Sequence, residues 1–443
     1  MSLPKYGVYA DSGVAWLGVV PAHWQVQRLR HLFEIRKRIV GEEGHRVLSI
    51  TQRGIKVKDI ESNDGQLSMD YSKYQTVHPG DFAMNHMDLL TGFVDISPYS
   101  GVTSPDYRVF AVRDGVPCEP RYFLHLLQNG YRQKVFYAFG QGASEFGRWR
   151  FPTDQFNDFR FPCPPPDEQR TIASFLDCET AKIDALIAEQ EKLIALLTEK
   201  RRATISHLVT KGLNPEAPMR DSGVAWLGEV PAHWQVKKLR HIADVVRGAS
   251  PRPAGDPEFF DSDNESGLNR PWVTVAEVTK DESPYLTEVT EYLTPAGVER
   301  SQSFASGTLI FTNSGATLGV PKILSVNCCA NDGILAFKGL SSDVEIRFLY
   351  LFLLTTTERL RTEMKQGGGQ PNLNTGIVKD ISFPLPPITE QRKIIDYVET
   401  RLGEFDALRA EAARATALLA ERRGALISAA VTGKIDVRSA VTC

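Results

Sequence analysis

The chain repeats part of itself almost letter for letter, and this duplication limits its possible folds more than any other feature. Residues 11–31 read DSGVAWLGVVPAHWQVQRLRH, and residues 221–241 read DSGVAWLGEVPAHWQVKKLRH. The two copies differ only at the pairs Val19/Glu229, Gln27/Lys237 and Arg28/Lys238. A second repeated block begins FPCPPPDEQRTIASFLD at Phe161 and FPLPPITEQRKIIDYVE at Phe383. The chain therefore builds the same framework twice.

Two stretches that lack comparable identity to each other separate the repeated blocks. We call residues 32–160 the first insert and residues 242–382 the second insert. A constant framework around unlike inserts predicts two domains with different ligands, and 443 residues suffice for at least two cores. The expected segments are a framework block (1–31), the first insert, a central spacer helix (161–213), a linker with the second framework block (214–241), the second insert, and a C-terminal spacer helix with its tail (383–443).

The second repeated block predicts a long helix in each copy. After three prolines, Asp167 is expected to cap the helix and Glu168 to lie in its first turn, and no Pro or Gly follows until Gly212. Apolar residues recur at steps of three, four and seven, which is typical of a coiled-coil seam. The seam residues are Ile172, Leu176, Ile183, Leu186, Leu193 and Leu197 in the first copy, and Ile394, Val398, Phe405, Leu408 and Leu419 in the second.

Two such helices within one chain predict an antiparallel coiled coil, because the duplicated ends must return the chain to both inserts. The whole chain would then have a pseudo-twofold internal repeat. Ile187 and Ile194 widen the apolar stripe beyond a strict two-helix seam. This leaves two interpretations open: the helices pack only on each other, or they also accept helices from another protein.

The block MRDSGVAWLGEVPAHWQVKKLR, which follows a K-G-L-N-P helix end, and the helix start FPxPPxxEQ resemble the specificity subunits of type I restriction-modification systems. Both motifs occur twice, in the order found in that family, and the resemblance covers nearly the whole chain. It implies that the inserts are target-recognition domains with a mixed α/β fold, each of which reads one half of an asymmetric bipartite DNA site. It also implies that the helices set the spacing and dock methyltransferase subunits.

The partners implied by the resemblance are double-stranded DNA, two DNA adenine methyltransferase subunits and, in a full complex, restriction subunits with motor and nuclease activity. S-adenosylmethionine and ATP are then expected on those subunits, and this chain is expected to hold no cofactor. Two other interpretations stay open. One is a coiled-coil scaffold whose inserts bind proteins and never DNA, and the other is the recognition subunit of a related system with a fused methyltransferase-nuclease partner.

Catalytic motifs are missing from the sequence. An adenine methyltransferase needs an Asn/Asp-Pro-Pro-aromatic element for the flipped base, whereas CPPP and PLPP here lack the leading amide or acid. A motor subunit needs GxxxxGK[ST], and residues 315–322 and 433–434 fail in spacing or in the final hydroxyl. The six cysteines show no zinc-site spacing, so no metal is expected. We therefore expect a subunit without catalysis of its own.

Charge and hydropathy add weaker expectations. The net charge of −3 argues mildly against a nucleic-acid partner, although a local basic surface can be offset by acidic helices elsewhere. No apolar run reaches the roughly 18 to 20 residues of a membrane span, and Met1–Tyr9 lacks the sections of a signal peptide. A cytoplasmic protein is the resulting expectation.

Sequence readout of DNA needs Arg, Lys, Asn or Gln on loops that reach base edges, with Gly, Ser and Thr near the backbone. Loops of this composition occur in both inserts, although each could also be an ordinary turn with surface ion pairs. The candidates are Gln52, Arg53, Lys56, Lys58, Ser144, Arg148 and Arg150 in the first insert, and Arg247, Arg252, Asn313, Thr317, Gln370 and Asn372 in the second.

The aromatic residues and histidines of the repeated block are expected to be structural. They are Trp16, Trp24, Trp226, Trp234, His23 and His233. Identical copies cannot distinguish two different half-sites, so packing explains them better than base stacking or metal binding.

Overall fold

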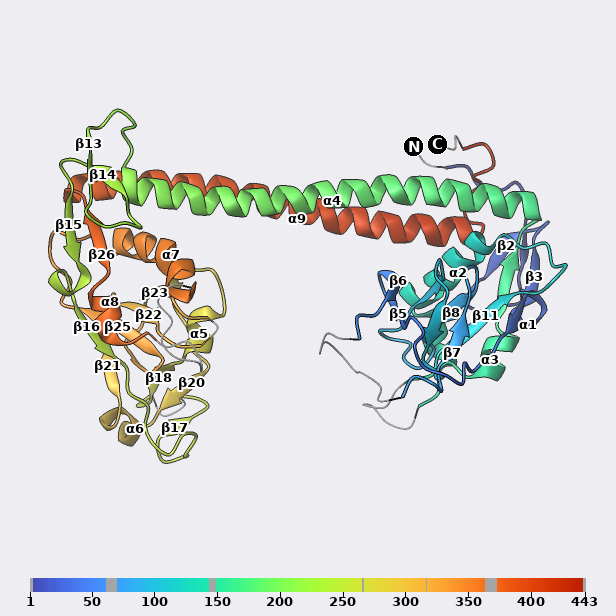
Figure 1. The fold of residues 1–443 in the computed structure, drawn as a ribbon, viewed down its shortest axis with the longest axis horizontal. Helices are drawn as coiled ribbons and strands as arrows, with labels where there is room; N and C mark the ends of the chain where they lie inside the picture. The colour runs from blue at the N-terminus through green and yellow to red at the C-terminus, as the bar shows by residue number, and fades with distance from the viewer. Residues whose placement is uncertain are drawn as a thin grey trace. The chain divides into compact units, whose positions relative to one another are not determined.

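The computed structural model describes residues 3–60, 70–142, 149–264, 267–315, 317–362 and 373–440. The fold is mixed α/β, as the sequence predicts. Contacts group the chain into two compact units, namely Met1–Glu191 with Ala412–Cys443 (the first unit) and Lys192–Glu411 (the second unit). Each unit contains one insert, one copy of the Trp-containing block and half of each long helix (Figure 1).

The first unit contains small antiparallel sheets around one four-stranded sheet of order β4-β11-β8-β9. Its elements are β1 (Tyr9–Asp11), β2 (Val19–Pro21), β3 (Gln25–Arg28), α1 (Leu29–Leu32), β4 (Phe33–Ile35), β5 (Leu48–Thr51), β6 (Gly54–Val57), β7 (Gln75–Val77), β8 (Phe82–Met84), β9 (Val94–Ile96), β10 (Gly101–Thr103), β11 (Arg108–Val112), α2 (Pro120–Arg132), η1 (Val135–Phe139), α3 (Thr153–Asp158), β12 (Arg160–Cys163) and the first half of α4 (Pro166–Lys211).

The second unit contains two five-stranded sheets, β16-β25-β22-β23-β19 and β17-β20-β18-β24-β21. Its elements are β13 (Met219–Asp221), β14 (Glu229–Pro231), β15 (Gln235–Lys238), η2 (Leu239–His241), β16 (Asp244–Arg247), β17 (Phe260–Asp261), β18 (Arg270–Val273), α5 (Val275–Thr279), β19 (Tyr285–Leu286), β20 (Glu291–Leu293), α6 (Pro295–Glu299), β21 (Gln302–Phe304), β22 (Leu309–Thr312), β23 (Pro321–Leu324), β24 (Cys328–Ala330), β25 (Ile334–Lys338), α7 (Ile346–Thr362), α8 (Thr375–Lys379), β26 (Ser382–Leu385) and the first half of α9 (Ile388–Val431).

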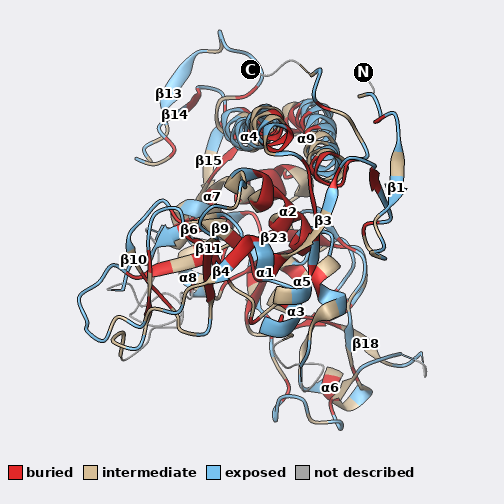
Figure 2. Cartoon of the chain, turned by 90° about the vertical axis from the view of Figure 1, so that its right-hand side faces the viewer, coloured by how far each residue is buried: buried red, intermediate tan, exposed pale blue. Residues whose placement is uncertain are grey.

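One helix of each insert lies between the long helices and a sheet, and this position explains why it is buried (Figures 1 and 2). In the first unit, α2 places Tyr122 and Phe123 in the same core as Ile172 of α4 and Phe110 of β11. In the second unit, α7 places Phe348 in the same core as Ile394 and Phe337. Burial of several large apolar side chains joins each insert to its long helices.

The long helices run antiparallel in each unit, as predicted. In the first unit, Ile172 near the start of α4 shares a core with Val431 at the end of α9. In the second unit, Leu208 near the end of α4 shares a core with Ile394 near the start of α9. The first long helix begins slightly earlier than predicted: α4 starts at Pro166, so Asp167 lies inside the first turn with an exposed side chain rather than at the N-cap.

The predicted seam is partly wrong. Most of the named side chains are buried, and Leu419 is half-buried, but Leu186, Leu193 and Leu408 are exposed by 51%, 41% and 49%. Steps of three and four residues from Ile183 can be taken in either order, and Ile187 and Ile194, the neighbours of Leu186 and Leu193, are half-buried. The three exposed leucines therefore lie beside the seam rather than in it.

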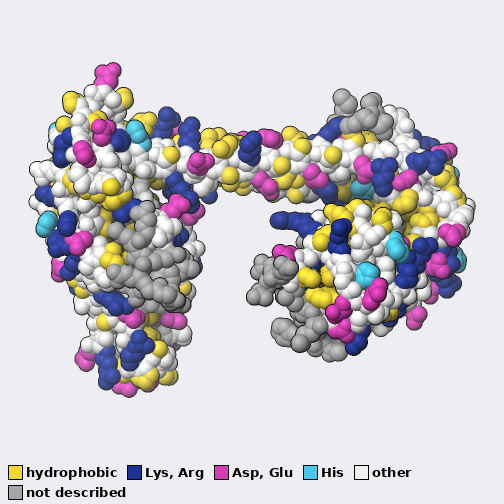
Figure 3. All heavy atoms as spheres, in the orientation of Figure 1, with side chains coloured by type: hydrophobic (Ala, Val, Ile, Leu, Met, Phe, Trp, Pro, Cys, Tyr) yellow, Lys and Arg dark blue, Asp and Glu magenta, His cyan; other side chains and the backbone are white. Residues whose placement is uncertain are grey.

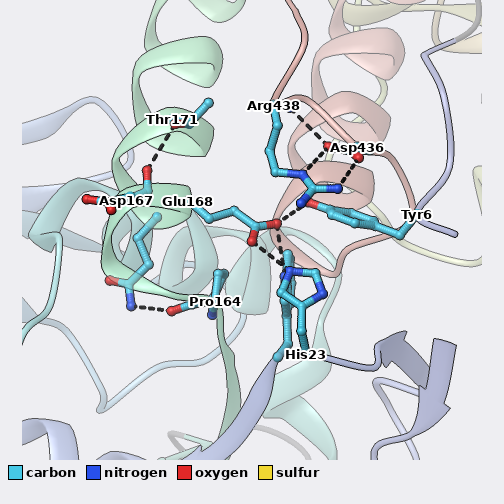
Figure 4. A network of polar contacts seen from close by, with 10 residues as sticks. Tyr6, His23, Pro164, Asp167, Glu168, Thr171, Asp436 and Arg438 are labelled. Carbon is cyan, nitrogen blue, oxygen red and sulfur yellow. Dashed lines mark hydrogen bonds and ion pairs between the residues drawn. The ribbon is translucent and has the colours of Figure 1, made fainter. Parts of the chain in front are cut away.

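A buried glutamate joins the first copy of the framework to the start of α4 (Figure 4). Glu168 is 6% exposed and accepts hydrogen bonds from the Tyr6 hydroxyl at 2.6 Å and from Trp24 Nε1 at 3.0 Å, and it lies 2.8 Å from His23 Nε2. Burial and the Glu168 carboxylate raise the pKa of Tyr6 far above its usual range, so this hydroxyl keeps its proton. The block thus has a structural role, as expected for its Trp and His residues.

The second copy repeats this junction with Glu390 of α9. Its carboxylate lies 2.8 Å from His233 Nε2 and accepts a hydrogen bond from Trp234 Nε1 at 3.2 Å. The next residue also serves both copies alike: Gln169 accepts the Glu119 N–H and Gln391 accepts the Glu345 N–H, at 2.9 and 2.8 Å. The EQ pair therefore ties the framework, the long helix and the insert together.

Candidate nucleic-acid interface

The candidates nearest the start of the first insert lie on a hairpin. Strands β5 and β6 pair from Leu48↔Val57 to Thr51↔Gly54, and the turn between them presents Gln52 and Arg53 to solvent. The turn is fixed by the Thr51 hydroxyl, which donates to the Gly54 carbonyl at 2.8 Å and accepts the Arg53 N–H at 3.1 Å. Gly54 has φ of +94°, a conformation that disfavours other residues.

Two lysines extend this polar surface. Lys56 is exposed on β6, and Lys58 is half-buried just beyond it, with its N–H bonded to the Val47 carbonyl at 2.8 Å. The N–H of Ile55, the residue before Lys56, donates to Asp95 Oδ2 at 3.3 Å, which holds β6 against β9. The hairpin therefore presents cationic and amide side chains from a fixed backbone.

Arg150, also in the first insert, is exposed and lies at the end of a separate loop. Its backbone pairs with Gln141 in both directions, at 2.8 and 2.9 Å. The loop returns to the core at Phe151, whose carbonyl accepts a hydrogen bond from the buried Arg108 at 2.9 Å. Ser144 and Arg148 lie outside the described residues, as do Gln370 and Asn372 of the second insert.

The structure brings together two of the candidates in the second insert. Arg247 at the end of β16 and Arg252 in the following loop both approach the Asp332 carboxylate, at 3.9 and 3.7 Å. Their side chains are 47% and 72% exposed, so both guanidinium groups reach solvent.

Asn313 was predicted to contact DNA, and the structure contradicts this. The residue is only 1% exposed, its N–H donates to the Gly333 carbonyl at 2.9 Å, and its carbonyl accepts the Leu373 N–H at 2.8 Å. The polar loop at the end of β22 is therefore joined through its backbone to Gly333, the residue after Asp332. Thr317 is half-buried, and its carbonyl accepts the Thr312 hydroxyl at 2.8 Å.

The first insert has an arginine pair that the sequence analysis missed. Arg36 and Arg38, just after β4, share Asp81, which is 5% exposed and also accepts the His78 N–H at 2.9 Å. The ion pair with Arg38 is the closer of the two, and Arg36 lies at 3.8 Å. The three consecutive basic residues at positions 36–38 were a usable signal, but nothing in the sequence indicated Asp81 as the partner of Arg36 and Arg38.

Among the described residues, none of the helices combines the length and the apolar character that crossing a lipid bilayer requires. Within the same part of the chain, no three His, Cys, Asp or Glu side chains come together as a group that could hold a metal ion.

Comparisons with known proteins agree on one family. A model of the type I restriction modification DNA specificity domain matches residues 231–410. The chain is 22% identical over 444 residues to the putative type I restriction enzyme MjaX specificity subunit of Methanocaldococcus jannaschii, with 96% of each protein covered.

Two solved structures share the fold over nearly the whole chain. One belongs to a study of complex assembly and conformational transition in the type I R-M system; it has a TM-score of 0.63 at 15% identity and covers 93% of this chain and 98% of its own. The other is the HsdS subunit from Thermoanaerobacter tengcongensis, with a TM-score of 0.52 at 15% identity and coverage of 94% and 98%.

Proposed function

Because the chain belongs to the family of type I restriction-modification specificity subunits, we propose that it is the non-catalytic DNA-reading subunit of such a system. Each insert reads one half of an asymmetric bipartite site in double-stranded DNA. The family's DNA specificity domain matches residues 231–410, in the second half of the chain. The same repeated blocks flank the first insert and the second insert, so the first insert is proposed to have the same role.

The observation that carries this proposal is the contrast between matched anchors and unmatched inserts. The two framework copies hold their long helices through the same Glu, His and Trp contacts. The inserts attached to them have different sheets, and their arginine pairs share carboxylates at different places in the fold. Equal anchors with unlike surfaces suit a target whose two halves differ in sequence.

The long helices are proposed to dock two DNA adenine methyltransferase subunits. The repeat relates Leu186 to Leu408 and Leu196 to Leu418, and these four side chains are exposed by 49% to 65%. Figure 3 shows apolar side chains among the charged ones along both helices. Each unit has one member of each pair, which suits two copies of one partner, because helical partners bury apolar stripes of this kind.

The chemistry in this proposal belongs to the partners. S-adenosylmethionine binds the methyltransferase subunits, and ATP binds a restriction subunit where one is present. The residues of this chain bind DNA and orient it, by charged contacts to phosphates and by hydrogen bonds to base edges.

Selection of bound duplexes from random DNA tests the proposal. The full chain, alone and with its methyltransferase subunit, is expected to enrich one interrupted motif with two different halves. Enrichment of no interrupted motif in either condition would contradict DNA reading and favour the scaffold interpretation.

Two matched variants test which insert reads which half-site of the DNA. Arg53→Gln is expected to weaken preference in one half-site only and Arg252→Gln in the other only, by about tenfold each, because each removes one donor group from one insert. Relaxation of both halves by either variant would contradict independent inserts.

Docking is tested separately on each unit. Leu186→Glu with Leu418→Glu changes the first unit, and Leu196→Glu with Leu408→Glu changes the second. Each pair is expected to reduce the methyltransferase count per complex from two to one by mass measurement. Val8→Glu, at a residue 69% exposed in the amino-terminal segment, is the control and should leave both subunits bound.

A further inference from the structure

Arg247, Arg252 and Asp332 form a charged cluster on two neighbouring loops of the second insert. Arg247 Nε donates a hydrogen bond to the Asp332 carbonyl at 2.6 Å, and the carboxylate of the same residue faces both guanidinium groups. One carboxylate therefore serves two arginines. The cluster keeps an excess of positive charge, and most of the guanidinium N–H donors remain available to a ligand.

The two loops are fastened to each other by backbone contacts. The Gly248 N–H donates to the Ile334 carbonyl at 2.9 Å, and the Ala249 N–H donates to the Ala330 carbonyl at 3.0 Å. A Cβ at Gly248 would lie 2.2 Å from the Asn331 carbonyl oxygen, so only glycine allows this approach. The arginines are thus held on a backbone that does not need to rearrange on binding.

Asp332 is itself held in one orientation. The Ser250 hydroxyl donates to its Oδ1 at 2.7 Å. That hydrogen bond is the main cause that lowers the pKa of Asp332, with smaller contributions from the two arginines, so the carboxylate is charged at neutral pH. The ionised group points away from Ser250 toward the arginines through Oδ2.

The cluster borders a hollow of about 490 Å³ on the surface of the second insert. Ser250, Arg252, Asn331 and Asp332 line one part of it, and Trp272 and Phe260 line another. Asp261 and Glu291 also line the hollow, which makes it unsuited to a phosphate lying at its centre. A base edge, which is uncharged and has hydrogen-bonding groups, suits these surroundings better.

We propose that the Arg247–Asp332–Arg252 cluster reads a G·C base pair in the second half-site, with arginine donating to guanine and Asp332 acting as the positioning residue. Guanine presents two acceptors, N7 and O6, in the major groove, and a guanidinium offers a matching fork of donors. Adenine presents an amino donor beside N7, which a donor-only side chain cannot satisfy. The inference rests on the proposed function, in which the second insert reads DNA.

The role of Asp332 follows from the flexibility of free arginine side chains. Without a fixed carboxylate, an exposed arginine can turn to the nearest phosphate, and phosphates are present in DNA of every sequence. With the carboxylate in place, the fork points in one direction and can discriminate between base pairs. Asp332 therefore affects sequence preference more than total affinity.

The test compares the full-length chain and its Asp332→Asn variant by selection from random duplexes and by binding to the selected site. The wild type is expected to show one strongly preferred G·C pair in the half-site read by the second insert. Asp332→Asn is expected to relax that position about tenfold, while the other half-site and the affinity for unrelated DNA are retained.

Asp244→Asn is the matched control, because Asp244 is an exposed carboxylate of the same insert that pairs with Lys379 and not with these arginines. It should leave the preference unchanged. Ser250→Ala removes the hydrogen bond that orients the Asp332 carboxylate, together with the longer one that the Asp332 N–H donates to the Ser250 hydroxyl at 3.4 Å. It should relax the same base pair to a smaller extent. This second variant also keeps the test decisive where Asp332→Asn unfolds.

Three outcomes would overturn the inference. An unchanged preference in Asp332→Asn, with the wild-type motif intact, contradicts the positioning role and leaves the proposed function standing. If Arg247→Gln and Arg252→Gln each weaken all sequences equally and lower the salt dependence by about one ion, the arginines contact phosphate instead. A wild type that selects no interrupted motif overturns the proposed function as well.

Discussion

The two units of this chain agree in their framework and differ in almost everything the framework holds. The distance from His23 Nε2 to Glu168 and the distance from His233 Nε2 to Glu390 are both 2.8 Å. The first insert, in contrast, has a four-stranded main sheet, whereas the second has two five-stranded sheets. The same junction can therefore support two inserts with unrelated surfaces, provided that each insert packs one helix against the long helices.

The junctions themselves differ in one respect, which is how well they are covered. Glu168 is 6% exposed, and Glu390 is 25% exposed. In the first unit, the carboxyl-terminal tail lies against the amino-terminal segment, where the Asp436 N–H donates to the Pro4 carbonyl at 2.7 Å and Arg438 lies 5.0 Å from the Tyr6 ring centre. The second unit has a continuous linker at this place, and no tyrosine donates to Glu390 among the hydrogen bonds of the described residues.

The largest expected effect follows from this difference. Glu168→Ala leaves the Tyr6, His23 and Trp24 donors without their acceptor in a buried site, and we expect it to lower the free energy of unfolding by about 3 kcal/mol. Glu390→Ala removes a more exposed acceptor with two donors, so about 1 to 2 kcal/mol is expected. Chemical denaturation of both variants measures the difference, and equal losses would show that the cover over Glu168 adds nothing.

The arginine pairs sharpen the comparison further. Arg36 and Arg38 surround the buried Asp81, whereas Arg247 and Arg252 surround Asp332, whose side chain is 46% exposed. Asp81 is buried and also accepts the His78 N–H, so we assign it to the stability of the fold. Asp332 is more exposed and is free to orient the arginine side chains toward a ligand.

Asp81→Asn is accordingly expected to lower the free energy of unfolding by about 2 kcal/mol, because it leaves partly buried arginine charge without compensation. Asp332→Asn should change stability by less than about 0.5 kcal/mol, as is usual for surface substitutions. Thermal unfolding of the two variants checks this order. A larger loss in Asp332→Asn would assign that residue to the fold rather than to recognition.

Much of the architecture could be predicted from the sequence, because the duplicated blocks form the framework of both units. Near-identity of residues 11–31 and 221–241 marked the framework, and the long run from Asp167 without Pro or Gly marked α4. The structural role of Trp24 was predictable as well, since identical copies cannot read different half-sites.

The seam and the contacts of the inserts were harder to predict for physical reasons. Apolar residues beside each other on a helix, such as Leu186 and Ile187, leave the direction of the seam ambiguous until a partner helix is placed. Asn313 is of a residue type that can bind DNA bases, but it is buried, because its backbone pairs with Gly333 and Leu373, which are distant in sequence. Local sequence contains no record of such tertiary pairing.

A short repeat inside the inserts was also missed. Glu119-Pro120-Arg121 and Glu345-Ile346-Arg347 begin α2 and α7, and their arginines pair with Asp177 and Glu399, which are equivalent positions of the long helices. Three residues are too few to stand out between unlike sequences. The structure shows that this E-x-R signature marks the helix by which each insert is attached.

The attachment of the first insert contains a carboxylate with a perturbed pKa. His125 lies 2.8 Å from Asp177, and its hydrogen bond, with the Arg121 charge, holds the pKa of Asp177 below its usual range. A carboxylate with a lowered folded pKa stabilises above its unfolded pKa of about 3.9 and loses this effect as the pH falls through the lower folded value.

Asp177→Asn should therefore be less stable than the wild type at pH 7, by less than about 1 kcal/mol because the site is partly exposed, and the two should converge as the pH falls below about 4. Urea midpoints measured from pH 7 to pH 3 test this. Glu399→Gln in the second unit is the matched control. A constant gap between Asp177→Asn and the wild type down to pH 3 would contradict the role of the charge.

The smallest expected effect compares one ion pair in its two copies along the long helices. Arg423 contacts Asp184 through two hydrogen bonds of 2.7 and 3.0 Å, whereas Arg201 lies 3.8 Å from Asp406, although the exposures of the two pairs are nearly equal. Asp184→Asn should lower stability by about 0.5 kcal/mol and Asp406→Asn by less than can be measured, because bidentate geometry decides the strength of exposed pairs. The difference should disappear near 1 M salt, where charges are screened over about 3 Å. Equal losses of stability in the two variants at low salt would contradict this prediction, because they would show that the two ion pairs contribute equally despite their different geometry.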